Sequence, residues 1–332
     1  MPLRRNAFLP CLFLLVIYAL PGLSAGASPA PDDLTQLDAT MSPRLEAGVK
    51  FMLDGYYEKA IAIFSQLEKE YPESPVGLLR RAETLWWKIL KLDGDFNRLH
   101  EMDVLKSNTP PFEKEFNAAV EKAIRLSEAL VKKYKTHPQA YFSLGIAYGL
   151  KSQMEGGKDN TIAAAKSAKK MKQNLDKCLS LDPNFADAFL EAGLYNYHMG
   201  SLPPVQNMAK FMIGLPSGDK KKGIELVKMA AAQDGLQGAE AKFYLAAIYS
   251  GPEIKKYQEA IALITDLRRQ FPNNPIFHLL LGHLYEKQGK WETAKSLYWD
   301  IIRTGQGRHE NYDESIVREA HAGMSRGPES GD

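Results

Sequence analysis

The chain has 332 residues, with 42 lysines and arginines against 40 aspartates and glutamates, and a formal net charge of +2. This balance argues against nucleic acid as a partner, because such binding needs clustered excess positive charge. With only two cysteines, the fold must be stabilised by packing and not by a framework of disulfides. A chain of this length can bury a core large enough for that.

The first 27 residues have the features of a cleavable secretory signal. Arg4 and Arg5 precede an apolar run over residues 8–20, and the small residues Ala25-Gly26-Ala27 follow it. A basic start, a short apolar core and such an ending are typical of an export signal. The run is also shorter than the ~18 residues that indicate a membrane span. We therefore expect an exported protein, periplasmic or secreted.

The expected mature chain begins with a flexible leader over residues 28–40, which is rich in proline and polar residues. Cleavage of residues 1–27 removes two arginines and one cysteine, which leaves 40 basic and 40 acidic residues. Cys178 is then the sole cysteine, so no intramolecular disulfide can form.

Two stretches, residues 48–72 and 281–301, repeat one pattern of small and aromatic residues. In each, small residues stand twelve positions apart, with an aromatic three after the first and four after the second: Gly48, Phe51, Ala60 and Phe64, then Gly282, Tyr285, Ala294 and Tyr298. This spacing predicts two antiparallel helices that approach closely at the small residues, with the aromatics in the seam. Gly55 and Gly289 stand where the chain must reverse, as left-handed cap residues would.

This pattern resembles the tetratricopeptide repeat, a helix-turn-helix unit of ~34 residues. The resemblance covers residues 41–305 and implies an all-α solenoid, a superhelix of about six antiparallel helix pairs, with inserts in repeats 2 to 4. Residues 306–324 have the apolar spacing of a capping helix that shields the last repeat. Residues 325–332 are rich in glycine, serine and charge, which predicts a disordered tail.

Few residues have the spacing of a catalytic or metal site. His278 and His283 are five apart and so lie off a common helix face, and Cys178 takes the small-residue position of a repeat, where a thiol packs as a compact hydrophobe. The Gly-Leu-Pro-Ser-Gly loop lacks the spacing of a phosphate loop. We expect Ser217 or Asp219 to cap the helix that follows. The sequence thus predicts no enzyme, no cofactor and no metal.

The family resemblance implies that one face of each first helix lines an inner groove. On this chain the candidate groove residues are Leu79, Trp86, Phe142, Ile146, Leu190, Leu194, Tyr197 and Phe243; the same face also carries Val76, Glu83, Leu279 and His283. The basic residues with which some family members bind a peptide carboxylate are missing. An apolar, aromatic groove suits a hydrophobic peptide, an amphipathic helix or an acyl chain.

The longest insert, residues 199–222, is itself apolar through Val205, Met208, Phe211 and Leu215. The insert either folds back and fills the groove or leaves the groove open to a ligand. Apolar patches of this size are seldom left bare, which favours the filled groove. We expect a non-catalytic scaffold for protein–protein interaction in the periplasm or cell envelope. The alternative is a carrier of a lipid or other apolar ligand, with the insert as its lid. A protein or peptide partner is expected, a lipid is the alternative, and the sequence does not define the oligomeric state.

The export signal makes a direct prediction about the mature protein. We expect its first residue near Ser28, because a signal peptidase cleaves after small residues such as Ala25 and Ala27. N-terminal sequencing of the exported material checks this. Recovery of a full-length chain that begins at Met1 in the membrane fraction would overturn the cleaved-signal interpretation.

Overall fold

The computed structural model describes most of the chain, in four segments: residues 33–96, 98–99, 104–201 and 214–327. The expected signal peptide lies outside the described residues. The chain divides into two compact units, residues 1–40 and 41–332. The packing described below is that of the second unit.

The described segments form thirteen helices: α1 (Asp33–Leu53), α2 (Tyr57–Glu70), α3 (Val76–Asp93), α4 (Glu113–Lys133), α5 (Pro138–Gly157), α6 (Thr161–Leu181), α7 (Ala188–Ser201), α9 (Lys220–Ala231), α10 (Gly235–Ser250), α11 (Tyr257–Gln270), α12 (Pro275–Lys287), α13 (Trp291–Gln306) and α14 (Glu314–Ser325). These segments contain no strand, and one isolated bridge joins Gly94 to Leu105. The all-α prediction is confirmed.

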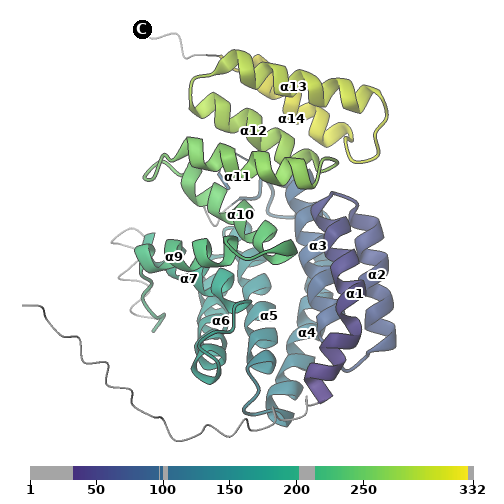
Figure 1. The fold of residues 1–332 in the computed structure, drawn as a ribbon, viewed down its shortest axis with the longest axis vertical. Helices are drawn as coiled ribbons and strands as arrows, with labels where there is room; N and C mark the ends of the chain where they lie inside the picture. Colours follow the sequence, from purple (N-terminus) through teal and green to yellow (C-terminus); the bar gives the residue numbers. More distant parts are fainter. Residues whose placement is uncertain (1–32, 97, 100–103, 202–213, 328–332) are drawn as a thin grey trace, which may run out of the picture. The chain divides into compact units, whose positions relative to one another are not determined.

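Consecutive helices pack in pairs, as Figure 1 shows. α3 packs on α4, α5 on α6, α7 on α9, α10 on α11 and α12 on α13, and each pair also packs on the next. With α1 and α2 before them, the helices of the described segments make the six predicted pairs. α14 packs on α12 and α13 and so covers the last pair, as a capping helix does.

At the amino-terminal end, α1 begins earlier than the sequence analysis predicts. Residues 33–40 are helical, although they fall within the expected flexible leader. The reason is visible in the sequence, because Leu34, Leu37 and Met41 continue the helical apolar spacing upstream of the first repeat.

At the carboxyl-terminal end, the capping helix is shorter than the predicted range of 306–324. It begins at Glu314 because Asp313 caps it, with its side chain accepting hydrogen bonds from the backbone of Ser315 and Ile316. The chain also stays bound beyond the helix. Arg326, within the expected disordered tail, forms an ion pair of 3.0 Å with Glu286.

The extra residues of the third repeat lengthen its helices. α5 and α6 have 20 and 21 residues, against 13 and 16 in α12 and α13, and only residues 158–160 separate them. The predicted insert in this repeat therefore adds helical turns. These turns carry Gln153 and Gly156 to the cavity described below.

The predicted turn glycines have the required backbone. Gly55 and Gly289 have φ of 86° and 72°, a region that side chains disfavour. In both turns the next residue donates to the carbonyl five positions back: Tyr56 to Phe51 at 2.8 Å, and Lys290 to Tyr285 at 2.9 Å. These are the bonds of a helix C-cap with a left-handed residue, as predicted.

The seam of the last pair is filled by Tyr298. Its ring is fully buried and lies against Gly282 of α12, where a Cβ atom would overlap ring carbons. Gly48 of α1 stands in the same way against Phe64 of α2. The small residue thus makes room for the ring one turn beyond the partner alanine. The capping helix packs on this ring in the same way, because Gly323 lies against the other edge of the Tyr298 ring.

The first repeat also contacts the last ones through a polar cluster that we call the clasp, made of Asp54, Asn273, Asn274 and Asn311. Asp54 accepts from the backbone and side chain of Asn273 at 3.0 and 2.9 Å, and Asn274 donates to the Leu53 carbonyl at 2.7 Å. Asn311 donates to the carbonyls of Asp54 and Asn273 at 3.2 and 3.1 Å. In a regular solenoid each repeat contacts only its neighbours, so the clasp is an additional long-range contact.

We predict that Gly282→Leu destabilises the last helix pair. The new side chain must displace the buried Tyr298 ring, and overpacking of this kind costs roughly 1–3 kcal/mol in the free energy of unfolding. Thermal melting and amide exchange measure the loss, which should begin in α12 to α14. Ser296→Leu, which adds bulk to an exposed position of α13, is the matched control. Unchanged exchange in Gly282→Leu would contradict the proposed register.

Candidate functional site: a cavity with aromatic and acidic walls

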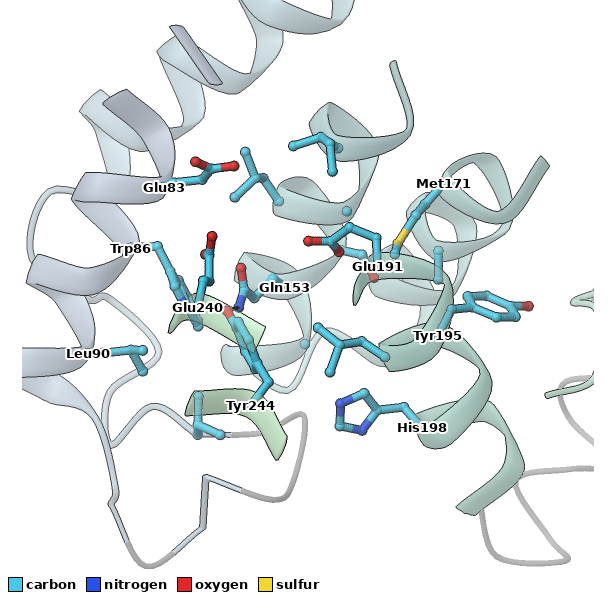
Figure 2. Close-up of a pocket in the computed structure, with 18 of the residues that line it drawn as sticks. Glu83, Trp86, Leu90, Gln153, Met171, Glu191, Tyr195, His198, Glu240 and Tyr244 are labelled. Carbon is cyan, nitrogen blue, oxygen red and sulfur yellow. Dashed lines mark hydrogen bonds between the residues drawn. The ribbon is translucent and has the colours of Figure 1, made fainter. Parts of the chain in front are cut away.

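A cavity of about 150 Å³ lies among the first helices of four consecutive repeats, α3, α5, α7 and α10, with α6 at one side. Figure 2 shows its side chains converging from these helices. One wall is aromatic and apolar, and includes Trp86, Trp87 and Phe243. Trp87 and Phe243 pack with ring centroids 4.6 Å apart, which fixes the position of this wall.

Four of the eight predicted groove residues line this cavity: Trp86, Ile146, Leu194 and Phe243. The other four do not. Leu79 is buried in the core beside it, and Leu190 is buried. Phe142 packs on Phe185 at 5.2 Å, and Tyr197 on His198 at the same distance.

The lining also contains acidic side chains. Glu83 of α3, Glu191 of α7 and Glu240 of α10 all line the cavity, and in Figure 2 the three carboxylates lie around one space. Each stands three residues before a predicted groove residue, in the pairs Glu83–Trp86, Glu191–Leu194 and Glu240–Phe243. Glu191 and Glu240 were missed by a search for apolar faces. The shared spacing of i and i+3 on one helix face was the signal that could have found them.

These carboxylates are not equally paired. Glu83 forms an ion pair of 2.7 Å with Arg80, one turn earlier on α3. Neither Glu191 nor Glu240 has a hydrogen bond or ion pair with any residue of the described segments. Arg80 is thus the cation shared among these carboxyl groups, and Glu191 and Glu240 have no ion pair of their own in the described segments.

The pKa values of the carboxyl groups reflect their burial and their unequal pairing. Burial, together with the charges of Glu240 and Glu83, raises the pKa of Glu191 to about 8, although Arg80 opposes the shift. Burial and Glu83 likewise raise the pKa of Glu240 well above its usual range. Desolvation and like charges both disfavour ionisation. A cation placed here would favour the ionised form of both groups and pair with it.

The cavity wall also holds a donor without an acceptor. Trp86 is 3% exposed, and its indole Nε1 has no hydrogen-bond partner in the described part of the chain. Buried polar atoms are nearly always paired in folded proteins. On the other side, Gln153 of α5 donates to the Tyr244 hydroxyl at 3.4 Å.

Of the described insert residues, Met199 lines the cavity, and the last ones lie close to it. Leu215 is 7% exposed and belongs to the core that surrounds the cavity. Next to it, the Tyr195 hydroxyl donates to the Pro216 carbonyl at 2.7 Å. Asp219 caps α9 by accepting from Lys222, as predicted. The remaining insert residues of the prediction, Val205, Met208 and Phe211, lie outside the described residues.

Other candidate chemistry lies elsewhere in the core. His278 and His283 are buried, 4% and 2% exposed, and burial lowers the pKa of each to about 3. Burial raises the pKa of the Cys178 thiol to about 12, so the thiol stays protonated. Within the described segments, no group of His, Cys, Asp and Glu could hold a metal ion. In those segments, too, no helix combines the length and apolar character that a membrane crossing requires.

A second cavity, of about 260 Å³, lies beside the clasp. Its lysines are already paired: Lys91 with Asp313 at 2.7 Å, Lys59 with Glu310 at 3.3 Å, and Lys88 with Glu58. It therefore lacks the unpaired charge that distinguishes the first cavity.

The six helix pairs and their capping helix define an all-α repeat protein. Residues 255–313 match the family model described as the tetratricopeptide repeat. This stretch, which includes α11, α12 and α13, thus matches the tetratricopeptide repeat, in agreement with the repeated pattern of the sequence. Among curated proteins, none matches this chain.

Several solved structures match this chain at low sequence identity. TTC0263, a thermophilic TPR protein of Thermus thermophilus, is 18% identical with a TM-score of 0.41, over 73% of this chain and 97% of that one. Yeast Tom70 is 11% identical with a TM-score of 0.25, over 82% and 86%. The TPR2AB domain of yeast Sti1, solved in a pHSP90 complex, is 12% identical with a TM-score of 0.23, over 85% and 99%.

We predict that Glu191→Gln flattens the pH dependence of stability. Because the folded-state pKa of Glu191 lies above the unfolded one, the folded protein holds the proton more tightly. Its contribution to stability is therefore complete at low pH and is lost as the pH rises from about 5 to 8.

The variant should accordingly match the wild type at pH 4 and exceed its free energy of unfolding by roughly 1–3 kcal/mol at pH 8.5. Urea unfolding at several pH values measures this. Glu225→Gln, at a glutamate of α9 whose side chain is 66% exposed, should leave the profile unchanged. Parallel profiles for Glu191→Gln and the wild type would contradict the assigned burial of this charge.

Proposed function

We propose that this protein is a non-catalytic scaffold that binds a partner protein through a short peptide segment held at the cavity. The observation that carries the proposal is the position of the cavity on the first helices of four repeats, with a rigid aromatic wall beside unpaired carboxylates. A few aromatic anchors in a buried pocket supply most of the free energy in peptide and protein binding.

The size of the cavity favours a peptide over the lipid carrier. A cavity of about 150 Å³ holds a group about the size of a benzene ring, whereas pockets that enclose whole drug-sized ligands have about 300–1,000 Å³. One amino-acid side chain fits this space and a long acyl chain does not. The carboxylates would in addition repel the anionic head of a fatty acid or phospholipid.

We further propose that the protein acts after export, in the periplasm or cell envelope, and needs no cofactor. The support for the location is the pattern of residues 1–27. The support for the absence of catalysis is that the cavity lining contains no cysteine, threonine or lysine, that burial raises the pKa of the Tyr195 and Tyr244 hydroxyls, and that the described residues offer no metal-binding set. The near-neutral charge is the reason to propose a protein partner and no nucleic acid.

Filling the cavity tests the scaffold proposal. Gly149 of α5 lines it, and a Cβ there would lie 3.3 Å from the Met171 sulfur and 3.8 Å from a Glu191 carboxylate oxygen. We predict that Gly149→Leu folds normally, because leucine is the better helix former, and occupies the space. Peptides selected from a random display library on the wild type should then bind this variant at least roughly 10-fold more weakly, the loss of about 1.4 kcal/mol expected for one buried anchor.

Gly149→Ala is the matched control, since it adds only the Cβ and should keep most of the affinity. Isothermal titration of the selected peptides gives the numbers, and circular dichroism verifies the fold of both variants. If the selected peptides bind Gly149→Leu as tightly as the wild type, the cavity is not the binding site.

A further inference from the structure

We propose that the cavity recognises a lysine side chain of the bound peptide, with the ammonium group at Glu191 and Glu240 and the alkyl stem along the aromatic wall. This inference rests on the proposed peptide-binding function and specifies the residue that the peptide must carry. Three features of the cavity lead to it: its charge, its geometry and its aromatic lining.

The glutamates of the cavity can pair with a cation that a ligand supplies. Glu83, Glu191 and Glu240 line one space, and Arg80 is the guanidinium that offsets them, through its ion pair with Glu83. Glu191 and Glu240 therefore have no ion pair of their own within the described segments. Removing a carboxylate from water without a partner is costly, and an ammonium group at hydrogen-bond distance would offset this cost.

The arrangement of the acceptors fits an ammonium better than a guanidinium. The carboxylates of Glu191 and Glu240 come from two different helices, α7 and α10, and approach the cavity from each of them (Figure 2). An ammonium carries three donors that point in different directions. A guanidinium is planar and is best matched by one carboxylate in its own plane.

The aromatic wall suits the rest of the lysine side chain. Trp86, Trp87, Phe243 and Tyr244 line the cavity, and a cation near the face of such rings gains further electrostatic stabilisation. Apolar contact with the four-carbon stem adds to the binding. The indole N–H of Trp86 has no hydrogen-bond partner in the described part of the chain. A backbone carbonyl of a peptide could accept its hydrogen bond, whereas a simple alkylammonium has no acceptor.

The experiment compares three versions of one selected peptide, with lysine, norleucine or arginine at the same position. Norleucine keeps the alkyl stem and removes the charge. We expect lysine to bind roughly 10- to 100-fold more tightly than norleucine, as for a charge-assisted hydrogen bond in a part-buried site, with arginine in between. Quenching of tryptophan fluorescence, to which Trp86 and Trp87 contribute, reports occupancy alongside titration calorimetry.

Two protein variants locate the effect. In the double variant Glu191→Gln, Glu240→Gln, the preference for lysine over norleucine should disappear while the norleucine peptide still binds. Glu225→Gln, on the exposed face of α9, should keep the full preference. A preference that survives the double variant, or a lysine peptide no tighter than its norleucine version on the wild type, would overturn the inference and leave the scaffold function standing.

A third arm separates lysine in a peptide from small amines. n-Pentylammonium is titrated alone, with n-pentanol as its neutral match. Binding that is weaker than that of the lysine peptide supports the peptide as the source of the ammonium. If pentylammonium binds as tightly as the peptide, or binds when no peptide does, the cavity is a small-amine site, and the inference fails together with the scaffold function.

Discussion

The packing of this protein depends on the absence of side chains at a few positions where two helices of a repeat meet. The buried ring of Tyr298 lies between Gly282 and Gly323 and so holds α12, α13 and α14 together. Gly48 against Phe64, Gly145 against Leu175 and Gly193 against Val227 are equivalent contacts in other pairs. Close approach at these seams sets the spacing of the helix pairs. That spacing in turn brings the first helices of four repeats to one cavity.

Much of the fold could be predicted because the pattern of each repeat is visible within a short stretch of sequence. The small-residue seams and the glycine turns depend on neighbours within a single hairpin, and here the structure follows the sequence closely. The clasp could not be foreseen. Its bonds between the first repeat and the last ones join residues 219 or more positions apart. In the sequence, polar residues at turns look the same whether they bind solvent or another repeat. The lengthening of α5 and α6 was likewise hidden, because Met154 to Asn160 reads as a glycine-containing loop.

The cavity was only half predictable, for a physical reason. Assigning each first helix one apolar face selects Trp86, Ile146, Leu194 and Phe243, which line the cavity. Phe142 and Tyr197 lie on the same type of helix but pack on local aromatic neighbours instead. Glu191 and Glu240 were missed because glutamates are usually solvated. Burial of a carboxylate follows from how four repeats converge, which no single repeat encodes.

The acidic side chains of the cavity lower the stability of the fold while they can provide specificity in binding. A cavity that keeps ionisable groups away from water, with a raised pKa at Glu191, is less stable at neutral pH than an apolar one would be. Binding sites commonly retain such costs, because the same groups provide specificity when the partner arrives. Arg80 moderates the cost at Glu83 and leaves the other two carboxylates exposed to the cavity.

The clasp has a consequence for how this protein can change over evolutionary time. Open arrays of repeats gain and lose copies readily, since a new unit only needs to match its two neighbours. Here the turn at Asp54 must meet Asn273 and Asn311 across the intervening pairs. Duplication or loss of one pair would move these partners apart by the thickness of a hairpin and leave buried amides unpaired. The copy number of the array is therefore constrained by a few polar side chains, and variation is directed into the lengths of helices and inserts.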